Sequence, residues 1–143
     1  MKQIIFLAVV ALAASAPVCS FSQDKKATVY FIRETGMPGF ALGFNAFIDS
    51  AVVCRLNNNR YSVHEVSAGV HSFHAQTMGK KEAKYPERIV LDLEEGKTYY
   101  IQMVYVDKYF VDKLYVQEIT SGTAQVKLKK CKEDTKCLAE KKE

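Results

Sequence analysis

The sequence predicts an all-β protein, an antiparallel β-sandwich of about seven or eight short strands of the immunoglobulin or prealbumin type, with a short C-terminal helix. Three observations support this prediction. Apolar residues alternate with period two along most of the chain, turn residues recur at short intervals, and a helical period occurs only near the C-terminus. The 143 residues suffice for one domain, and contents of 48% hydrophobic and 25% charged residues are typical of a folded domain.

The first residues are predicted to be an export signal. An apolar run, Ile4–Ala16, follows a positively charged start and is shorter than the about 20 residues that a membrane-spanning helix needs. These features are typical of a secretory signal peptide over residues 1–22, with Gln23 as the new N-terminus. An acylated Cys19, which would make the chain a lipoprotein, is the less favoured alternative, because Pro-Val directly precedes it. We therefore expect an exported protein that is periplasmic or extracellular.

Five strands are predicted in the first half of the mature chain. Between the first two, residues 35–43 contain three Gly and one Pro, which indicates a loop. Asp49-Ser50 lies where a two-residue hairpin turn belongs, and the run Asn57–Asn59 marks another turn. Gly69 supplies the positive φ that a tight hairpin between the fourth and fifth strands needs. The five strands are Ala27–Arg33, Asn45–Ser50, Ala51–Leu56, Arg60–Val66 and Val70–Thr77.

Three further strands follow a charged connection over residues 80–86. Ile89, Leu91 and Leu93 point to one side of the first of them, which is the clearest half-buried strand in the chain. In the next strand, the odd-numbered residues of Tyr99–Tyr105 share one face. The three strands are Glu87–Glu94, Lys97–Asp107 and Leu114–Ile119.

A helical period appears only after the last strand. Ala124, Leu128 and Cys131 follow one another at helical spacing, and Thr120 or Ser121 is suited to cap a helix. This pattern predicts a helix over residues 122–131. Behind the signal peptide, the chain is therefore divided into a β-sandwich domain over residues 23–131, which includes this helix, and a charged tail over residues 132–143.

Three segments, in this order, resemble a known pattern. They are the opening strand Ala27–Arg33, the turn over residues 68–71 and the segment Leu93–Tyr100. Together they resemble a bacterial family of small exported proteins, often lipoproteins, that is known only as a domain of unknown function. They are also similar in pattern to the PEGA-type surface domains, although Ala68 stands here where those domains have Pro. The resemblance implies an all-β domain of the cell envelope and supplies no catalytic residue.

The three histidines are weak candidates for a metal site. His71 and His74 point to opposite faces of their strand, so they cannot bind one ion together. A two-residue hairpin loop would make His64 a diagonal neighbour of His71, whereas a three-residue loop would make it a neighbour of His74. A zinc site needs a third and a fourth ligand, which the sequence does not indicate. We therefore expect imidazoles at the surface or half-buried, with no metal centre and no cofactor.

Cysteine pairing is expected because the protein is predicted to be exported. Cys131 and Cys137 are the natural disulfide pair, provided that the helix ends near Cys131. Cys54 is then left as a small buried hydrophobic residue, although its pairing with either of the other two stays open. A catalytic pair of Cys54 with a histidine is a remote alternative, since no third, orienting group is indicated.

The loop over residues 36–44 and the exposed tyrosines are the candidate binding residues. The loop has neither glycine spacing of the phosphate-binding motifs, but it is unusually apolar. Its apolar side chains either fold back over the open end of the sandwich or form a lip that contacts a partner or a small ligand. The tyrosines could stack on a glycan, although the chain has no Trp. The candidate ligand-binding residues are Met37, Phe40, Phe44, Tyr100 and Tyr109.

The net charge of +4 is too small to predict binding to nucleic acid. Residues 23–126 carry 12 basic and 12 acidic side chains, so the excess charge of the mature chain lies in residues 127–143. This end could contact an anionic surface weakly, but a solvated tail is the favoured interpretation. We therefore expect a non-enzymatic binding or structural module of the envelope, with an envelope protein or a glycan as partner. The alternative is a small-ligand or glycan binder that uses the loop and the tyrosines.

Overall fold

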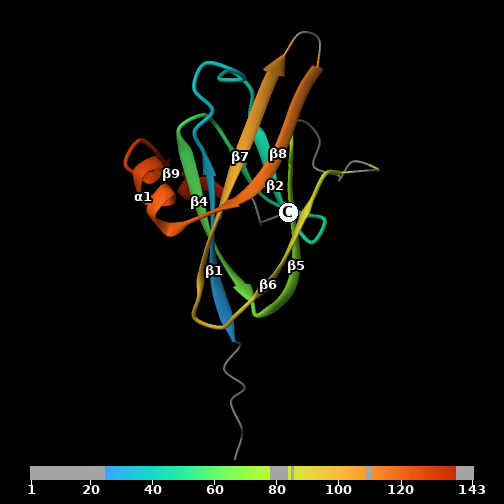
Figure 1. Ribbon diagram of the computed structural model, residues 1–143, viewed down its shortest axis with the longest axis vertical. Helices are drawn as coiled ribbons and strands as arrows, with labels where there is room; N and C mark the ends of the chain where they lie inside the picture. The colour runs from blue at the N-terminus through green and yellow to red at the C-terminus, as the bar shows by residue number, and fades with distance from the viewer. Residues whose placement is uncertain (1–24, 78–83, 85, 109–110, 138–143) are drawn as a thin grey trace, which may run out of the picture.

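The computed structural model describes residues 25–77, 84, 86–108 and 111–137, and the predicted signal peptide lies outside them. The described chain forms two β-sheets packed face to face, with one short helix on the outside (Figure 1). This architecture confirms the predicted all-β sandwich. The elements are β1 (Lys26–Arg33), β2 (Phe44–Ile48), β3 (Ala51–Leu56), β4 (Arg60–Ser67), β5 (Gly69–Gln76), β6 (Ile89–Leu93), β7 (Thr98–Lys108), β8 (Val111–Ile119), α1 (Ser121–Leu128) and β9 (Lys132–Glu133).

The two sheets contain strands that are not neighbours in sequence. The five-stranded sheet has the order β8-β7-β1-β4-β9, and the four-stranded sheet has the order β3-β2-β5-β6. The pairs are antiparallel except for β1 with β7 and β4 with β9, which are parallel. These parallel pairs arise because neither β7 nor β9 enters the sheet through a hairpin with the strand beside it. The five-stranded sheet is therefore mixed rather than antiparallel throughout.

The predicted hairpin between the fourth and fifth strands is wrong. β4 pairs with β1, whereas β5 pairs with β2 and β6, so the chain crosses from one sheet to the other at Ala68. Gly69 has φ of 124°, and Ala68 N donates a hydrogen bond of 2.7 Å to Lys25 O. Alternation of apolar residues shows which face of a strand is buried, but it does not show which strand lies beside it. A strand with one apolar face can bury that face in either sheet.

The core lies between the inner faces of the two sheets. Phe31 of β1 and Phe73 of β5 are fully buried, and their ring centroids lie 6.1 Å apart across the sandwich. Ile101 and Met103 of β7 are also fully buried. The faces predicted from period-two alternation are therefore confirmed for β6 and β7, whose partly buried core residues are Ile89, Leu91, Tyr99 and Tyr105.

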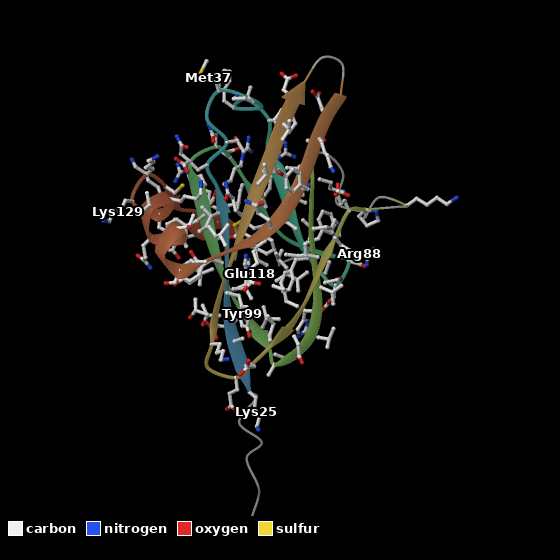
Figure 2. The ribbon with its side chains drawn as sticks, viewed as in Figure 1. Lys25, Met37, Arg88, Tyr99, Glu118 and Lys129 are labelled. Atoms are coloured by element: carbon white, nitrogen blue, oxygen red, sulfur yellow. A yellow bond between two sulfur atoms is a disulfide. The ribbon has the colours of Figure 1, made fainter. Side chains whose placement is uncertain are left out.

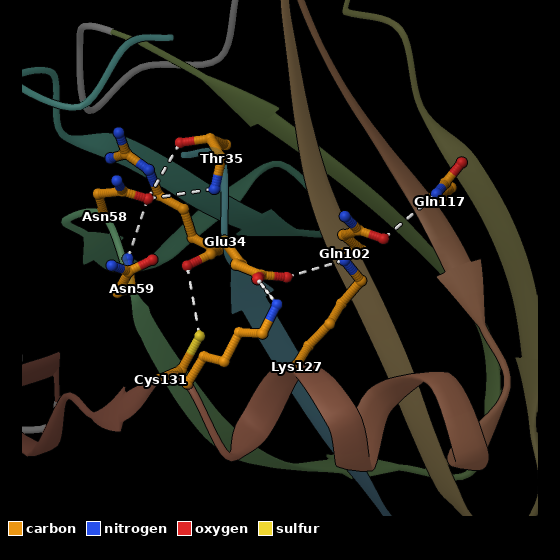
Figure 3. Close-up of polar contacts among 10 residues, drawn as sticks. Glu34, Thr35, Asn58, Asn59, Gln102, Gln117, Lys127 and Cys131 are labelled. Carbon is orange, nitrogen blue, oxygen red and sulfur yellow. Dashed lines mark hydrogen bonds and ion pairs between the residues drawn. The ribbon is translucent and has the colours of Figure 1, made fainter. Parts of the chain in front are cut away.

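Helix α1 covers the outer face of the five-stranded sheet. It begins after Thr120, whose side chain accepts a hydrogen bond from Thr123 N, and it ends three residues before the predicted end. Glu34, which directly follows β1, forms ion pairs with Lys127 Nζ and Lys130 Nζ, at 2.9 Å each (Figure 3). The hydrogen bond from Lys130 and the contact with Lys127 outweigh burial and lower the pKa of Glu34. These two ion pairs attach the C-terminal part of the chain to the end of β1.

The predicted disulfide between Cys131 and Cys137 is also wrong, because Cys137 is bonded to Cys54 of β3. Cys131 is a thiol, and its Sγ donates to Arg33 O at 3.6 Å. After α1, the chain pairs with β4 through β9, which brings Cys137 rather than Cys131 to β3. Residues 132–137 of the predicted charged tail therefore belong to the fold, and residues 138–143 lie outside the described chain.

We expect Cys137→Ser to lower the free energy of unfolding by about 3–5 kcal/mol, because a disulfide that closes a long loop restricts the unfolded chain most. The Cys54–Cys137 bond spans a sequence separation of 83 residues. Denaturant unfolding of the mature protein measures the change. Cys131→Ser is the matched control and should change the stability little. Equal losses from both substitutions would contradict the Cys54–Cys137 pairing.

Candidate functional site

A buried arginine holds the loop between β1 and β2. The Arg33 side chain is fully buried at the end of β1, and its Nη1 donates to Leu56 O at 2.6 Å and also to Leu42 O. Nη2 donates to Gly39 O at 2.7 Å, and the guanidinium lies 3.6 Å from the centroid of the Phe44 ring. Burial, together with the charge of Arg55, lowers the pKa of Arg33 to about 10. The guanidinium therefore stays charged at neutral pH and fixes two loop carbonyls.

A second anchor holds the beginning of the same loop. Asn58, in the predicted turn before β4, accepts hydrogen bonds of 3.1 Å from the backbone N and the Oγ1 of Thr35 (Figure 3). Its Nδ2 donates to Gly36 O at 2.7 Å. The loop is therefore attached at its start to the turn between β3 and β4, and in its middle to Arg33 of β1. Although it consists of turns and bends, its backbone is held on two sides.

The loop presents three apolar side chains to solvent, Met37, Phe40 and Leu42, the last of which is 42% exposed. Met37 is 80% exposed and Phe40 is 61% exposed, and Figure 2 labels Met37 at the tip of the loop. Phe44 does not belong to this lip, because it begins β2 and is fully buried beneath Arg33. Of the predicted loop candidates, the structure therefore leaves Met37 and Phe40 exposed and corrects the assignment of Phe44 to a core position.

A groove of about 400 Å³ lies beside this loop, between the two sheets. Figure 1 shows the loop at the same end of the molecule as the β7–β8 hairpin. Gly39 packs against Tyr105 so closely that a Cβ would lie 2.9 Å from the ring, and its φ of +66° also favours glycine. The loop thus forms one wall of the groove. The lining residues are Leu42, Ala75, Gln76, Thr77, Tyr105, Asp112 and Leu114.

The groove is lined by both apolar and polar side chains. Burial and a hydrogen bond with Asp112, together with the charge of Asp107, raise the pKa of Tyr105. The phenol therefore stays protonated and donates to the Asp112 carboxylate, which leaves carboxylate lone pairs for a ligand. Leu42 and Leu114 line the same groove. Such a lining is suited to a ligand with an apolar body and a hydrogen-bond donor or cationic group.

Tyr100 lies elsewhere, in a row of tyrosines on the outer face of the five-stranded sheet. The ring centroids of Tyr30 and Tyr100 are 5.1 Å apart, and those of Tyr30 and Tyr61 are 6.1 Å apart in a stacked arrangement. All three rings are half-buried. Tyr109 lies outside the described residues. The structure therefore does not bring Tyr100 to the loop and groove, with which it was grouped in the sequence prediction.

The structure separates the histidines. His64 faces the core from β4 and meets Phe31 edge-on, at 5.9 Å between ring centroids. His71 and His74 lie in the other sheet and on opposite faces of β5, and His74 stacks on Phe47 at 4.4 Å. Because β4 and β5 do not form the predicted hairpin, both predicted pairings of His64 with a histidine of β5 are wrong. Among the described residues, no group of three or more His, Cys, Asp or Glu side chains is placed to hold a metal ion.

His71 belongs to a cluster that the sequence does not reveal. Its Nδ1 contacts Asp49 Oδ2 in the β2–β3 turn, and its Nε2 lies 2.9 Å from Ser67 O and 3.3 Å from Ser67 Oγ. Asp49 Oδ1 also accepts a hydrogen bond of 2.9 Å from Ser72 N. Burial opposes ionisation of Asp49, but the hydrogen bonds from Ser72 and His71 lower the pKa of this carboxyl. Asp49 has φ of 48° in this turn, which is uncommon for a residue other than glycine. This backbone conformation is the one local feature that distinguishes Asp49 from its neighbours in β2.

The cluster has the residue types of a hydrolytic triad but a different geometry. His71 Nε2 lies closer to the carbonyl oxygen of Ser67, at 2.9 Å, than to the Ser67 hydroxyl, at 3.3 Å, and a carbonyl oxygen can only accept a hydrogen bond. A catalytic base needs a free lone pair on the nitrogen that faces the serine hydroxyl. The arrangement therefore clamps the β2–β3 turn to the crossing between the sheets.

The cysteines also offer no activated sulfur in the described chain. Cys54 is engaged in the disulfide, so its sulfur is not a free nucleophile. Burial and the charge of Glu34 raise the pKa of Cys131, which keeps it a protonated thiol at neutral pH. The remote alternative of a catalytic Cys54–His pair is therefore not supported by these positions.

We expect Arg33→Lys to destabilise the protein by about 2–3 kcal/mol, because a lysine cannot reproduce three planar, charged hydrogen bonds to carbonyls. Amide hydrogen exchange in residues 36–43 should accelerate more than exchange in the strands. The exposed Arg88, which precedes β6 and is not among the contacts of Arg33, provides the control, since Arg88→Lys should leave both the stability and the exchange nearly unchanged. Exchange in the loop that is unaffected by Arg33→Lys would show that the guanidinium does not hold it.

Comparison with known proteins finds no family model that matches the chain and no curated protein with significant sequence similarity. No helix of the described residues is both long enough and apolar enough to cross a membrane. The resemblance to the bacterial domain of unknown function therefore stays a prediction, and the function must be argued from the geometry of the groove, the loop and the tyrosine row.

Proposed function

We propose that this chain is an exported β-sandwich that acts as a non-enzymatic binding module of the bacterial envelope. The observation that carries the proposal is the groove beside the loop over residues 36–44. Its polar and apolar walls, together with the exposed Met37 and Phe40, provide a concave surface with an apolar rim. Exposed apolar side chains at the edge of a groove are typical of binding sites.

The chemistry of the walls suggests the kind of ligand. Asp112 and Tyr105 line the groove together with aliphatic side chains such as Leu42. A ligand with an alkyl or aromatic body would remove apolar surface from water, at about 25 cal/mol per Å². A cationic or hydrogen-bond-donating group on that ligand would meet Asp112. We therefore propose an amphipathic ligand, either a small molecule or an apolar side chain of an envelope protein.

Arg33 makes this end of the sandwich suited to binding. A loop that is ordered before the ligand arrives loses less conformational entropy on binding than a loop that must be ordered by the ligand. The hydrogen bonds of Arg33 to Gly39 and Leu42 and those of Asn58 to Thr35 supply this order. The apolar side chains project from a backbone that is already held.

The proposal can be tested with N-phenyl-1-naphthylamine, a neutral amine whose fluorescence rises in apolar sites. We expect the mature protein to bind this probe, and Leu42→Asp to weaken binding about fivefold or more by placing a charge in the apolar wall. The control is Val126→Ser, which replaces an exposed valine on α1, outside the groove. A cationic alkylammonium should displace the probe better than an alkyl sulfate. Equal binding by Leu42→Asp and the wild type would contradict the proposal.

A second candidate function is favoured by the tyrosine row. Three neighbouring strands place Tyr61, Tyr30 and Tyr100 side by side on one sheet face, and aromatic rings stack on the apolar faces of sugars. A neutral oligosaccharide such as chitotetraose distinguishes the two candidates. Binding of this sugar that is lost in Tyr100→Ala and kept in Leu42→Asp would favour the tyrosine face over the groove.

The proposed export can be tested by the mass of the mature N-terminus. We expect protein isolated from a bacterial envelope after expression of the full chain to begin at Gln23, because small residues stand at the two positions that signal peptidase reads. Intact-mass spectrometry measures this directly. An acylated Cys19 would support the lipoprotein alternative, and an uncleaved chain that is recovered from the cytoplasm would contradict the export.

A further inference from the structure

One edge of the four-stranded sheet is neither covered nor blunted by the described chain. β6 pairs with β5 on one side, and no described strand pairs with its other side. Figure 1 shows β6, in yellow, next to β5, with which it pairs. An unpaired edge exposes a row of backbone donors and acceptors that can pair with another strand. β6 contains no Lys, no Pro and no shift of register against β5, which are common protections of such an edge, and Asp92 is the one charged residue within it.

The other edges of the two sheets are protected. β3 is joined to the C-terminal segment by the Cys54–Cys137 disulfide, and its register against β2 is interrupted by a bulge. β9 has only two residues. β8 carries Lys113, whose ammonium pairs with Glu87 at 3.1 Å. β6 is therefore the edge that differs from the rest.

The outer face of the sheet next to this edge is apolar. Val90 of β6 is 60% exposed, and Val70 of β5 is 68% exposed. The register places Val70 opposite Asp92 and Val90 opposite Ser72, so the two valines are diagonal neighbours on one face. Single exposed valines are common, but two together beside an unpaired strand enlarge the surface that a further strand would cover.

The segment Arg88–Asp92, which consists of Arg88 and the first four residues of β6, is complementary to itself. When two copies of this strand pair antiparallel around a two-fold axis at Val90, Val90 stands opposite its own copy. Residues at equal distances on either side of the axis then meet, so Arg88 stands opposite Asp92 of the other copy, and the same pair recurs by symmetry. On the inner face, Ile89 meets Leu91. Opposite charges and paired apolar side chains both stabilise antiparallel strands.

We propose that the protein forms a symmetric dimer through β6, in which a second copy of this chain adds its own β6 antiparallel, with Val90 at the two-fold axis. The four-stranded sheets of the two copies then form one continuous sheet. Figure 2 labels Arg88 at the outer margin of the molecule, where a second copy would meet it. The groove and the loop over residues 36–44 do not include β6, so this interface is independent of the proposed binding site.

A charge exchange tests this interface. Sedimentation velocity of the mature protein over a wide concentration range should show a monomer–dimer equilibrium. Arg88→Asp and Asp92→Arg should each raise the dissociation constant about tenfold or more, because each creates two pairs of like charges across the axis. The double variant restores both pairs with reversed charges and should return the constant to within about threefold of the wild type.

Three outcomes would overturn the proposal. They are a wild type that stays monomeric at every concentration, single variants that dimerise as well as the wild type, and a double variant that remains as weak as the single ones. Circular dichroism of each variant separates loss of the dimer from loss of the fold. A wild type that stays monomeric but binds an added extended peptide at β6 would assign the edge to a different partner.

A cross-link tests the register itself. Opposed Cβ atoms in an antiparallel pair lie about 4.5–5.5 Å apart, which is close enough for a disulfide after a small adjustment. In a Cys131→Ser background, Val90→Cys should form a covalent dimer under mild oxidation, and the matched variant Val70→Cys should not, because Val70 lies on β5 away from the axis. Equal cross-linking of the two variants, or none, would overturn the placement of Val90 at the two-fold axis.

Discussion

The buried guanidinium of Arg33 is the interaction on which the loop end of this sandwich depends. A cation that is removed from water is costly unless its hydrogen-bonding groups are satisfied. Here the two terminal nitrogens donate to three carbonyls, the face of the Phe44 ring adds a cation–π contact, and of the guanidinium nitrogens the buried Nε alone has no hydrogen-bond partner among the described residues. The charge is therefore stabilised by backbone dipoles, and the same hydrogen bonds order the loop. The position of Met37 and Phe40 at the surface follows from this arrangement.

The two ends of the sandwich are closed by different means. At the loop end, Arg33 joins β1 to the loop and to β3. At the other end, His71 joins β5 to the β2–β3 turn through Asp49 and to the end of β4 through Ser67. Each clamp links segments that belong to different sheets, so each restricts movement of one sheet against the other. The groove lies at the loop end, and it is the end for which we propose binding.

The C-terminal segment closes one side of the sandwich. Glu34 holds α1 to the end of β1, β9 extends the five-stranded sheet, and the disulfide at Cys54 joins this segment to the four-stranded sheet. The opposite side has no comparable covalent link among the described residues. There β6 keeps an unpaired edge with apolar residues beside it. Within the described residues, three sheet edges are protected and the fourth is not, which makes the fourth a surface suited to strand addition.

Local chemistry in the sequence determined much of the architecture. Alternating apolar residues predicted the strands and the buried faces of β6 and β7, and Asp49-Ser50 marked a real hairpin turn. Tertiary structure decided which strands are neighbours and what Arg33, Cys137 and His71 contact. The physical reason is that alternation, turn residues and caps act within a few residues, whereas these contacts join segments far apart in sequence. Cys137 is nearer to Cys131 along the chain, but the strand pairing of β9 carries it to Cys54.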